Sequence, residues 1–283
     1  MQVNPVVAAA GLAFPEAPRW HDGALWFSDM YAGQVFRLVP GEQPRAVATV
    51  PEHPSGLGFL PDGRLLVVSM QDRRVLRLDA DGLHEHADLS KLATWHANDM
   101  LVDAAGHAYV GNFGDASAPP DPPAPVPLIL VQPDGAVSVA TPELRFPNGM
   151  TLINGGRTLV VAETRSVPPR LTAFDVAADG TLSEQRVLAE FEDEMPDGIC
   201  ADAADHIWVA SPFTAGVLRV APDGSVVTRI ASPLPPYACA LGGADGRTLF
   251  IAGAVTWRPD EALAARTGQI LAVPVDVPAV GAA

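Results

Sequence analysis

The sequence predicts an all-β protein, a six-bladed β-propeller with four-stranded antiparallel blades, and three observations support this prediction. One pattern recurs six times at intervals of roughly 40–50 residues, which is the spacing of propeller blades. Helical periodicity is weak everywhere, and its best stretch is residues 259–267. The copies cover the 283-residue chain, and they start at Pro15, Pro54, Ala97, Pro147, Pro196 and Pro236.

Each copy contains two strands joined by a turn such as HDG, PDG, DAAG, INGG or GADG. Third strands are expected at QVFRLVP, RVLRLDA, LILVQPDG, RLTAFDV, GVLRVAPDG and QILAVPV, and outer fourth strands at AVATV, VSVA, QRVLAEF and VVTRIA. The last copy has no fourth strand of its own. We therefore expect the N-terminal segment VNPVVAAAG to supply it and to close residues 1–283 into a single domain.

Composition limits the partners and the compartment. The formal net charge of −15 argues against nucleic acid and anionic membrane surfaces as partners. The chain does not open with a basic segment and a long apolar region, and no stretch approaches the roughly 18 apolar residues of a membrane span, so we expect a cytoplasmic protein. Cys200 and Cys239 lie in apolar strand patterns and are expected to be free thiols, since reducing compartments disfavour a disulfide.

The first strand of each propeller blade lines the central channel, so equivalent residues near its start form a ring around the axis. Taken alone, each of these tripeptides reads as a turn, but their shared repeat position favours one common site. Carboxylate and amide oxygens suit hard cations, and Ca²⁺ is the expected ion, with Zn²⁺, Mn²⁺, Mg²⁺ and Fe²⁺ as alternatives. The ring consists of Glu16, Ser55, Asn98, Asn148, Asp197 and Tyr237, and the four predicted metal ligands are Glu16, Asn98, Asn148 and Asp197.

The loops that follow the second strands should form the mouth of this site, because antiparallel second strands end on the face where the first strands begin. These loops span residues 29–33, 70–74, 114–127, 164–170, 211–216 and 253–268. Ordinary packing between blades is the alternative reading of their large side chains. The predicted substrate-binding residues are His96, Asn98, Met30, Met70, Phe113, Phe213, Tyr237 and Trp257.

Four segments of the chain resemble the senescence marker protein/gluconolactonase family, also called regucalcin-like. They are PEAPRWHDGALWFSD, ANDMLVDAAGHAYVGNFG, FPNGMTLINGGRTLVVAET and PDGICADAADHIWVAS, and the resemblance extends over essentially the whole chain. It implies a six-bladed propeller with one catalytic divalent metal ion that hydrolyses small-molecule lactones or, in some relatives, organophosphate esters. It also implies metal binding by Glu16, Asn148 and Asp197, and a role for Asp197 as general base or nucleophile. Asn98 matches the asparagine of the family's N-D-x-x-x-D motif, which contacts metal or substrate.

The chemistry agrees with these residue types, because a metal polarises a lactone carbonyl while a neighbouring carboxylate takes a proton from water. Glu16 and Asp197 are both candidates for that carboxylate, and only the resemblance favours Asp197. Sugar-lactone members of the family carry an arginine two residues before the asparagine of the third motif, where this chain has His96. Because an imidazole offers fewer donors to a sugar ring, we expect a less polar lactone or ester, aromatic or alkyl-substituted.

Three alternatives stay open at this point. His96 or His53, each next to a ring residue, is a second candidate for the general base. A calcium-binding propeller without turnover would use the same ring, and a protein-binding module would need no ring at all. A strictosidine-synthase-like activity is disfavoured, since such propellers lack the Glu/Asn/Asn/Asp ring.

Overall fold

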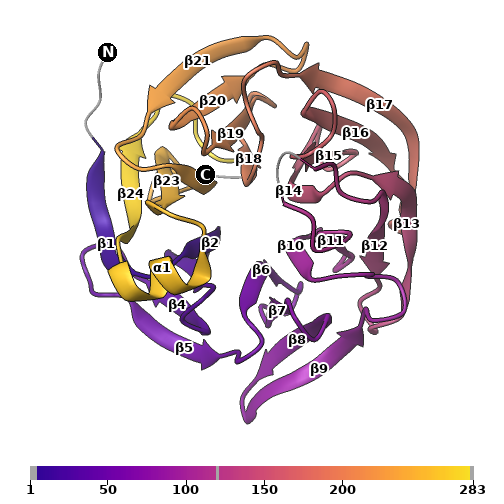
Figure 1. Cartoon of the computed structure of the whole chain (residues 1–283), viewed down its shortest axis with the longest axis horizontal. Coiled ribbons are helices and arrows are strands. Elements are labelled where there is room, and N and C mark those ends of the chain that lie inside the picture. Colours follow the sequence, from indigo (N-terminus) through magenta and orange to yellow (C-terminus); the bar gives the residue numbers. More distant parts are fainter. Residues whose placement is uncertain (1–4, 119–120, 281–283) are drawn as a thin grey trace.

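The computed structural model describes residues 5–118 and 121–280. Six four-stranded antiparallel sheets surround a central axis, so the predicted six-bladed β-propeller is confirmed (Figure 1). Residues 3–4 of the expected closing segment, residues 119–120 of the third mouth loop and residues 281–283 lie outside the described part of the chain.

Blades 1 to 5 each use four consecutive strands, ordered from the axis outward. Blade 1 contains β2 (Pro15–His21), β3 (Ala24–Asp29), β4 (Gln34–Leu38) and β5 (Arg45–Thr49). Blade 2 contains β6 (Pro54–Phe59), β7 (Leu65–Ser69), β8 (Arg74–Asp79) and β9 (Gly82–Asp88). Blade 3 contains β10 (Ala97–Val102), β11 (Ala108–Asn112), β12 (Val126–Val131) and β13 (Val137–Leu144). Blade 4 contains β14 (Pro147–Ile153), β15 (Thr158–Glu163), β16 (Arg170–Val176) and β17 (Leu182–Glu190). Blade 5 contains β18 (Ile199–Ala201), β19 (Ile207–Ser211), β20 (Gly216–Val220) and β21 (Val226–Ala231).

Blade 6 is assembled from both ends of the chain. Its inner strands are β22 (Pro236–Gly242), β23 (Thr248–Gly253) and β24 (Gly268–Pro274), and its outermost strand is β1 (Val6–Leu12). β1 pairs with β24 in an antiparallel register from Val6 opposite Ala272 to Leu12 opposite Gly268. This pairing covers the β24 edge that would otherwise stay open, and it ties the first blade to the last.

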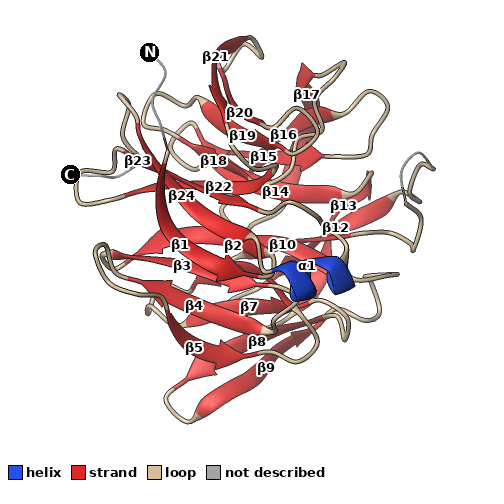
Figure 2. Cartoon of the chain, turned by 60° about the vertical axis from the view of Figure 1, so that its left-hand side comes forward, coloured by secondary structure: helices blue, strands red, loops and turns tan. Residues whose placement is uncertain are grey.

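The strand register defines two faces of the propeller. The start of each inner strand lies opposite the end of the second strand, as in the pairs Pro54 with Ser69 and Pro147 with Glu163. We call the face where the inner strands begin the mouth face and the opposite one the far face. The short helix α1 (Pro259–Ala265) belongs to a mouth-face loop, between β23 and β24 (Figure 2). Within the described residues, no helix has the length and apolar character needed to cross a membrane.

The core lies between neighbouring blades, and the glycine that follows three of the six ring residues allows the inner strands to approach. A Cβ atom on Gly56 would lie 2.3 Å from the backbone nitrogen of Met100, and one on Gly149 would lie 2.4 Å from the carbonyl oxygen of Asp197. Real side chains cannot occupy such space, so only glycine fits. The recurring Pro-x-Gly pattern therefore packs the inner strands closely around the axis.

Candidate metal centre

The ring predicted from the repeats occupies one level of the propeller. Five of its members are the second residue of an inner strand, whereas Asp197 comes two residues before β18 because that strand is short. The five are Glu16 in β2, Ser55 in β6, Asn98 in β10, Asn148 in β14 and Tyr237 in β22.

A chain of hydrogen bonds joins three of the four predicted ligands across blades 3, 4 and 5. Asn98 Nδ2 donates to Asn148 Oδ1 at 3.0 Å, and Asn148 Nδ2 donates to Asp197 Oδ1 at 2.5 Å. All three side chains are buried, with no more than 9% of their surface exposed. Residues that are about 50 positions apart in sequence thus meet in one polar cluster.

Glu16, the fourth predicted ligand, lies close enough to this cluster for its charge to be felt. Its Oε2 accepts a hydrogen bond from the backbone nitrogen of Ala17 at 3.0 Å. Burial raises the pKa of Glu16 to about 8, although part of its surface stays accessible. Burial is also the main cause that raises the pKa of Asp197, and the charges of Glu16 and Asp99 raise it further. The axis therefore holds carboxylates that resist ionisation together.

Arg19, whose positive charge acts on Glu16, is already paired with a different acid, Asp99. Arg19 lowers the pKa of Glu16, but its NH2 nitrogen donates to Asp99 Oδ1 at 2.8 Å and to the Met100 carbonyl oxygen at 2.7 Å. Glu16 and Asp197 have no such partner among the described ion pairs. Two carboxylates and two side-chain amides are a donor set that fits a hard divalent cation, which would supply the missing positive charge.

A residue that the sequence did not single out orients Asn148. Asn148 Nδ2 donates to Thr164 Oγ1 at 3.1 Å as well as to Asp197, and Thr164 in turn donates to the Pro196 carbonyl oxygen at 2.7 Å. Both hydrogens of the Asn148 amide are thus engaged, so its oxygen is held away from Asp197. Thr164 follows directly after β15, and this position at the end of a second strand is the signal that could have identified it.

The mouth of the site is lined with apolar and aromatic side chains. Met30, Met70 and Tyr237 are buried in one cluster with Phe14, and Phe113 packs against it. The ring centroids of Phe14 and Tyr237 are 4.5 Å apart. Four of the predicted substrate-binding residues therefore lie together, and Phe14 is a member that the sequence did not indicate.

His96 continues this apolar lining in blade 3. Its ring stacks on Trp95 at 4.7 Å between centroids and lies 6.1 Å from Phe113, which stacks on Phe146 at 4.6 Å. Burial lowers the pKa of His96, and the charge of His53 lowers it further. A neutral imidazole among aromatic rings is the expected state at neutral pH.

The remaining two predicted wall residues lie outside this cluster. Phe213 is 63% exposed and Trp257 is 49% exposed. The backbone of Trp257 is linked to the mouth, because its carbonyl oxygen accepts a hydrogen bond from the Tyr31 hydroxyl at 2.6 Å. The structure therefore gives Phe213 no position in the buried lining.

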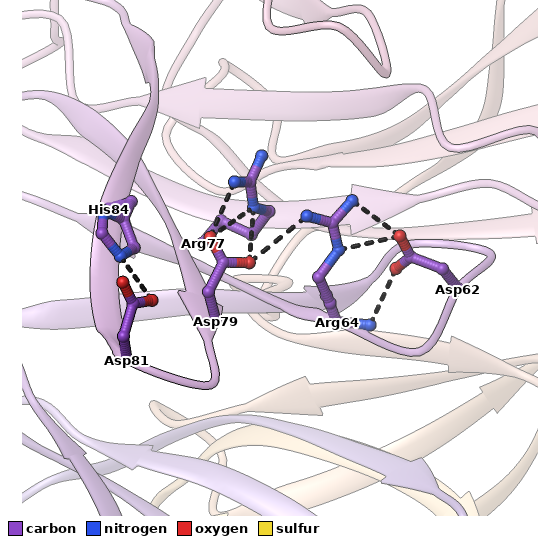
Figure 3. A network of polar contacts seen from close by, with 6 residues as sticks. All are labelled: Asp62, Arg64, Arg77, Asp79, Asp81 and His84. Carbon is purple, nitrogen blue, oxygen red and sulfur yellow. Dashed lines mark hydrogen bonds and ion pairs between the residues drawn. The ribbon is translucent and has the colours of Figure 1, made fainter.

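A second acidic group lies on the far face of blade 2, where Asp79, Asp81 and His84 bring possible ligand atoms within 4.8 Å of one another (Figure 3). Asp79 is already bound by Arg77 Nε at 2.9 Å and by Arg64 NH1 at 3.3 Å. Arg77 is the main cause that lowers the pKa of Asp79, to about 2. This far-face cluster is an ion-pair network in which arginine takes the place that a metal would need.

The fold and the axial cluster together define a β-propeller with a buried acidic site at the mouth end of its axis. The chain belongs to the family described as SMP-30/gluconolactonase/LRE-like region, whose model matches residues 14–255. This assignment agrees with the resemblance found in the sequence.

Two curated proteins of known activity are similar over most of the chain. A 6-deoxy-6-sulfogluconolactonase of Pseudomonas putida is 27% identical over 274 residues, which cover 93% of this chain and 91% of that protein. A pentonolactonase of Haloferax volcanii is 26% identical over an aligned region that covers 83% of this chain and 80% of that protein.

Solved structures support the fold. A luciferin-regenerating enzyme superposes with a TM-score of 0.84 at 19% identity, covering 99% of this chain and 98% of its own. A regucalcin of Agrobacterium tumefaciens, described as a calcium-binding protein, superposes with a TM-score of 0.83 at 21% identity, covering 99% and 96%.

Proposed function

We propose that this protein is a metal-dependent lactonase that opens a lactone, or a related ester, at the mouth end of its axial channel. The observation that carries the proposal is the buried cluster of Glu16, Asn98, Asn148 and Asp197. The ion pairs of the described residues give its two carboxylates no cationic partner. Membership of the SMP-30/gluconolactonase family supports lactone hydrolysis as the reaction, and both curated relatives are named as lactonases.

The four side chains of the cluster would hold the metal through carboxylate and amide oxygens, and Ca²⁺ is the ion we propose. When bound, a divalent cation supplies Lewis acidity to the lactone carbonyl and favours the negative charge that develops on its oxygen. It also keeps the neighbouring carboxylates ionised, which opposes the rise in the pKa values of Glu16 and Asp197 that burial causes.

Asp197 is the residue we assign as proton acceptor. Its Oδ1 is held by Asn148 Nδ2, which leaves Oδ2 free to take a proton from the attacking water. Glu16 is anchored through Oε2 to the backbone of Ala17, so its role is to bind and to balance charge. Thr164 and Asn98 fix the Asn148 amide from two sides and thereby keep Asp197 oriented.

The substrate that we propose is less polar than a sugar lactone. Met30, Met70, Tyr237 and Phe113 form an apolar cluster, and His96 presents a ring stacked on Trp95 instead of a charged donor. Such a surface favours the burial of apolar groups of a substrate and offers few hydrogen bonds to sugar hydroxyls. Both relatives are named for sugar lactones, so the substrate that we propose for this chain differs from theirs.

A substrate panel tests the proposal. We expect kcat/KM for an aromatic lactone such as dihydrocoumarin to exceed that for gluconolactone, and both activities to disappear with a chelator and to return with Ca²⁺. A strong preference for gluconolactone would reject the apolar substrate while leaving the lactonase reaction in place.

A calcium-binding role without turnover is the second candidate, supported by the similarity to the regucalcin that is described as calcium-binding. It predicts that the chelator lowers only the melting temperature, with no lactone opened by the metal-loaded protein. A protein-binding module would need none of the four clustered side chains, and no feature of the described surface favours it.

A further inference from the structure

The two cysteines of the chain lie next to each other between blades 5 and 6. Their Sγ atoms are 3.8 Å apart, although the residues are 39 positions apart in sequence. Cys200 belongs to β18 and Cys239 to β22, the innermost strands of adjacent blades. Because the chain has only these two cysteines, each thiol has a single possible partner within the molecule.

The backbones around the two cysteines are already in direct contact. Gly198 N donates to the Tyr237 carbonyl oxygen at 2.8 Å, and a Cβ atom on Gly198 would lie 2.5 Å from the Cβ of Ala238. A disulfide requires the two sulfurs to approach from 3.8 Å to about 2.05 Å. The strands that carry the two cysteines are in contact, so the remaining approach would come from rotation of the two side chains.

The two thiols differ in their surroundings. Cys239 is buried, and its Sγ lies 3.5 Å from the Trp208 carbonyl oxygen and 3.6 Å from that of Gly198. Burial raises the pKa of Cys239, so its thiol stays protonated. Cys200 is partly exposed. An oxidant from solution therefore reaches Cys200 first, with Cys239 poised to react second.

We propose that Cys200 and Cys239 are a redox modification site, at which a hydroperoxide converts the two thiols into a reversible disulfide between blades 5 and 6. With hydrogen peroxide, the Cys200 sulfur attacks one oxygen and the O–O bond breaks. Water departs, and Cys200 becomes a sulfenic acid. The Cys239 sulfur then attacks the sulfenic sulfur, the S–S bond forms, the S–O bond breaks, and a second water leaves with the Cys239 proton. Two thiols are oxidised, and one peroxide is reduced to two waters.

The disulfide would act close to the axial site. Asp197 lies three residues before Cys200, and Tyr237 lies two residues before Cys239. The bond would tie the segment that positions Asp197 to the inner strand of blade 6, and it would close a loop that contains most of blade 5. Closing such a loop restricts the unfolded chain and thereby stabilises the folded one.

Peptide mapping of the full chain tests this site. Purified protein is treated with one to two equivalents of hydrogen peroxide, denatured, alkylated with iodoacetamide and digested. We expect a peptide pair linked through Cys200 and Cys239, a monomer on a non-reducing gel, and two alkylated cysteines after dithiothreitol. The melting temperature should rise by about 5–10 °C on oxidation and fall back on reduction.

Other outcomes overturn the proposal. They are a sulfinic or sulfonic acid on Cys200 with Cys239 still open to alkylation, a disulfide-linked dimer, or two free thiols after the peroxide treatment. Cys200→Ser and Cys239→Ala serve as controls, and each should abolish the peroxide-dependent rise in melting temperature. If a variant fails to fold, the peptide map of the wild-type chain still decides the question.

Discussion

The axial cluster and the far-face cluster both gather acidic side chains, but they neutralise them in different ways. On the far face, Arg77 and Arg64 bind Asp79 directly, and the pKa of Asp79 falls to about 2 (Figure 3). On the axis, burial raises the pKa of both Glu16 and Asp197. The same chemical group is thus stabilised as an anion at one site and destabilised at the other.

This difference identifies the site at which binding of an added cation would be most favourable. An exposed acid already paired with arginine has little to gain from a metal, since its charge is balanced and solvated. Buried acids without a partner stay unfavourable until a cation or protons arrive. Proximity of acidic groups alone would favour the far-face cluster, so burial and pairing are the better guides to a functional metal centre.

The largest effect should come from Asp197→Asn. This change preserves shape but removes the proton acceptor and one anionic ligand, so we expect kcat for lactone hydrolysis to fall by about 10³-fold or more. Asp79→Asn is the matched control and should leave kcat unchanged. Steady-state kinetics with saturating Ca²⁺ measures both. Equal activity losses in the two variants would remove the distinction between the clusters.

Metal binding gives the next effect. Glu16→Gln removes one anionic ligand while keeping the side-chain volume, and we expect Ca²⁺ affinity to fall by about 10–100-fold. Titration calorimetry on chelator-treated protein measures this. Asp81→Asn on the far face should retain the wild-type affinity and a stoichiometry of one. A second, unchanged Ca²⁺ site in the Glu16 variant would point to the far face instead.

The pH dependence of stability separates the clusters without any assay of activity. In metal-free protein, Glu16 keeps its proton up to about pH 8 when folded but loses it near pH 4.5 when unfolded. Stability is therefore greatest below the unfolded value and falls as pH rises through this window. We expect the melting temperature to drop by about 5 °C between pH 5 and pH 8.

Two comparisons check the origin of that slope. Glu16→Gln should flatten it, because the titrating group is gone. Excess Ca²⁺ should reverse it, since metal binding displaces protons and becomes tighter as pH rises. A slope that survives both changes would have its source elsewhere in the molecule.

The sequence could predict that the ring residues lie at one height along the axis, because a residue's position within its repeat can be read directly from the sequence. Glu16, Asn98 and Asn148 share a register with each other, and one inner strand per blade places them at one height. The repeated glycine was visible too, but its reason appears only in the structure: a Cβ atom on Gly149 would lie 2.4 Å from the Asp197 carbonyl oxygen of the next blade.

The sequence could not predict contacts between blades that depend on how far individual side chains reach. Nothing in the pattern indicated that Arg19 in blade 1 would cross to Asp99 in blade 3. Within blade 4, the end of β15 indicated the position of Thr164 but not its hydrogen bond with Asn148. The sequence also gave no sign that Cys200 and Cys239 would meet, since their spacing reflects only the blade length. Such pairings are set by rotamers and blade curvature, which no local pattern records.

The smallest effect tests whether acids alone perform the chemistry at the axis. If His96 only lines the mouth, His96→Ala should change kcat by less than about threefold while raising KM for an aromatic lactone severalfold, because a stacked ring is lost. His53→Ala, on the neighbouring blade, should leave both constants nearly unchanged. A fall in kcat of about 10²-fold or more, together with a lost acidic limb in the pH profile, would make His96 the proton acceptor. Asp197 would then only bind the metal, and the axial acids would take no part in moving the proton. The axial acids would differ from the far-face acids only in the cation that they hold.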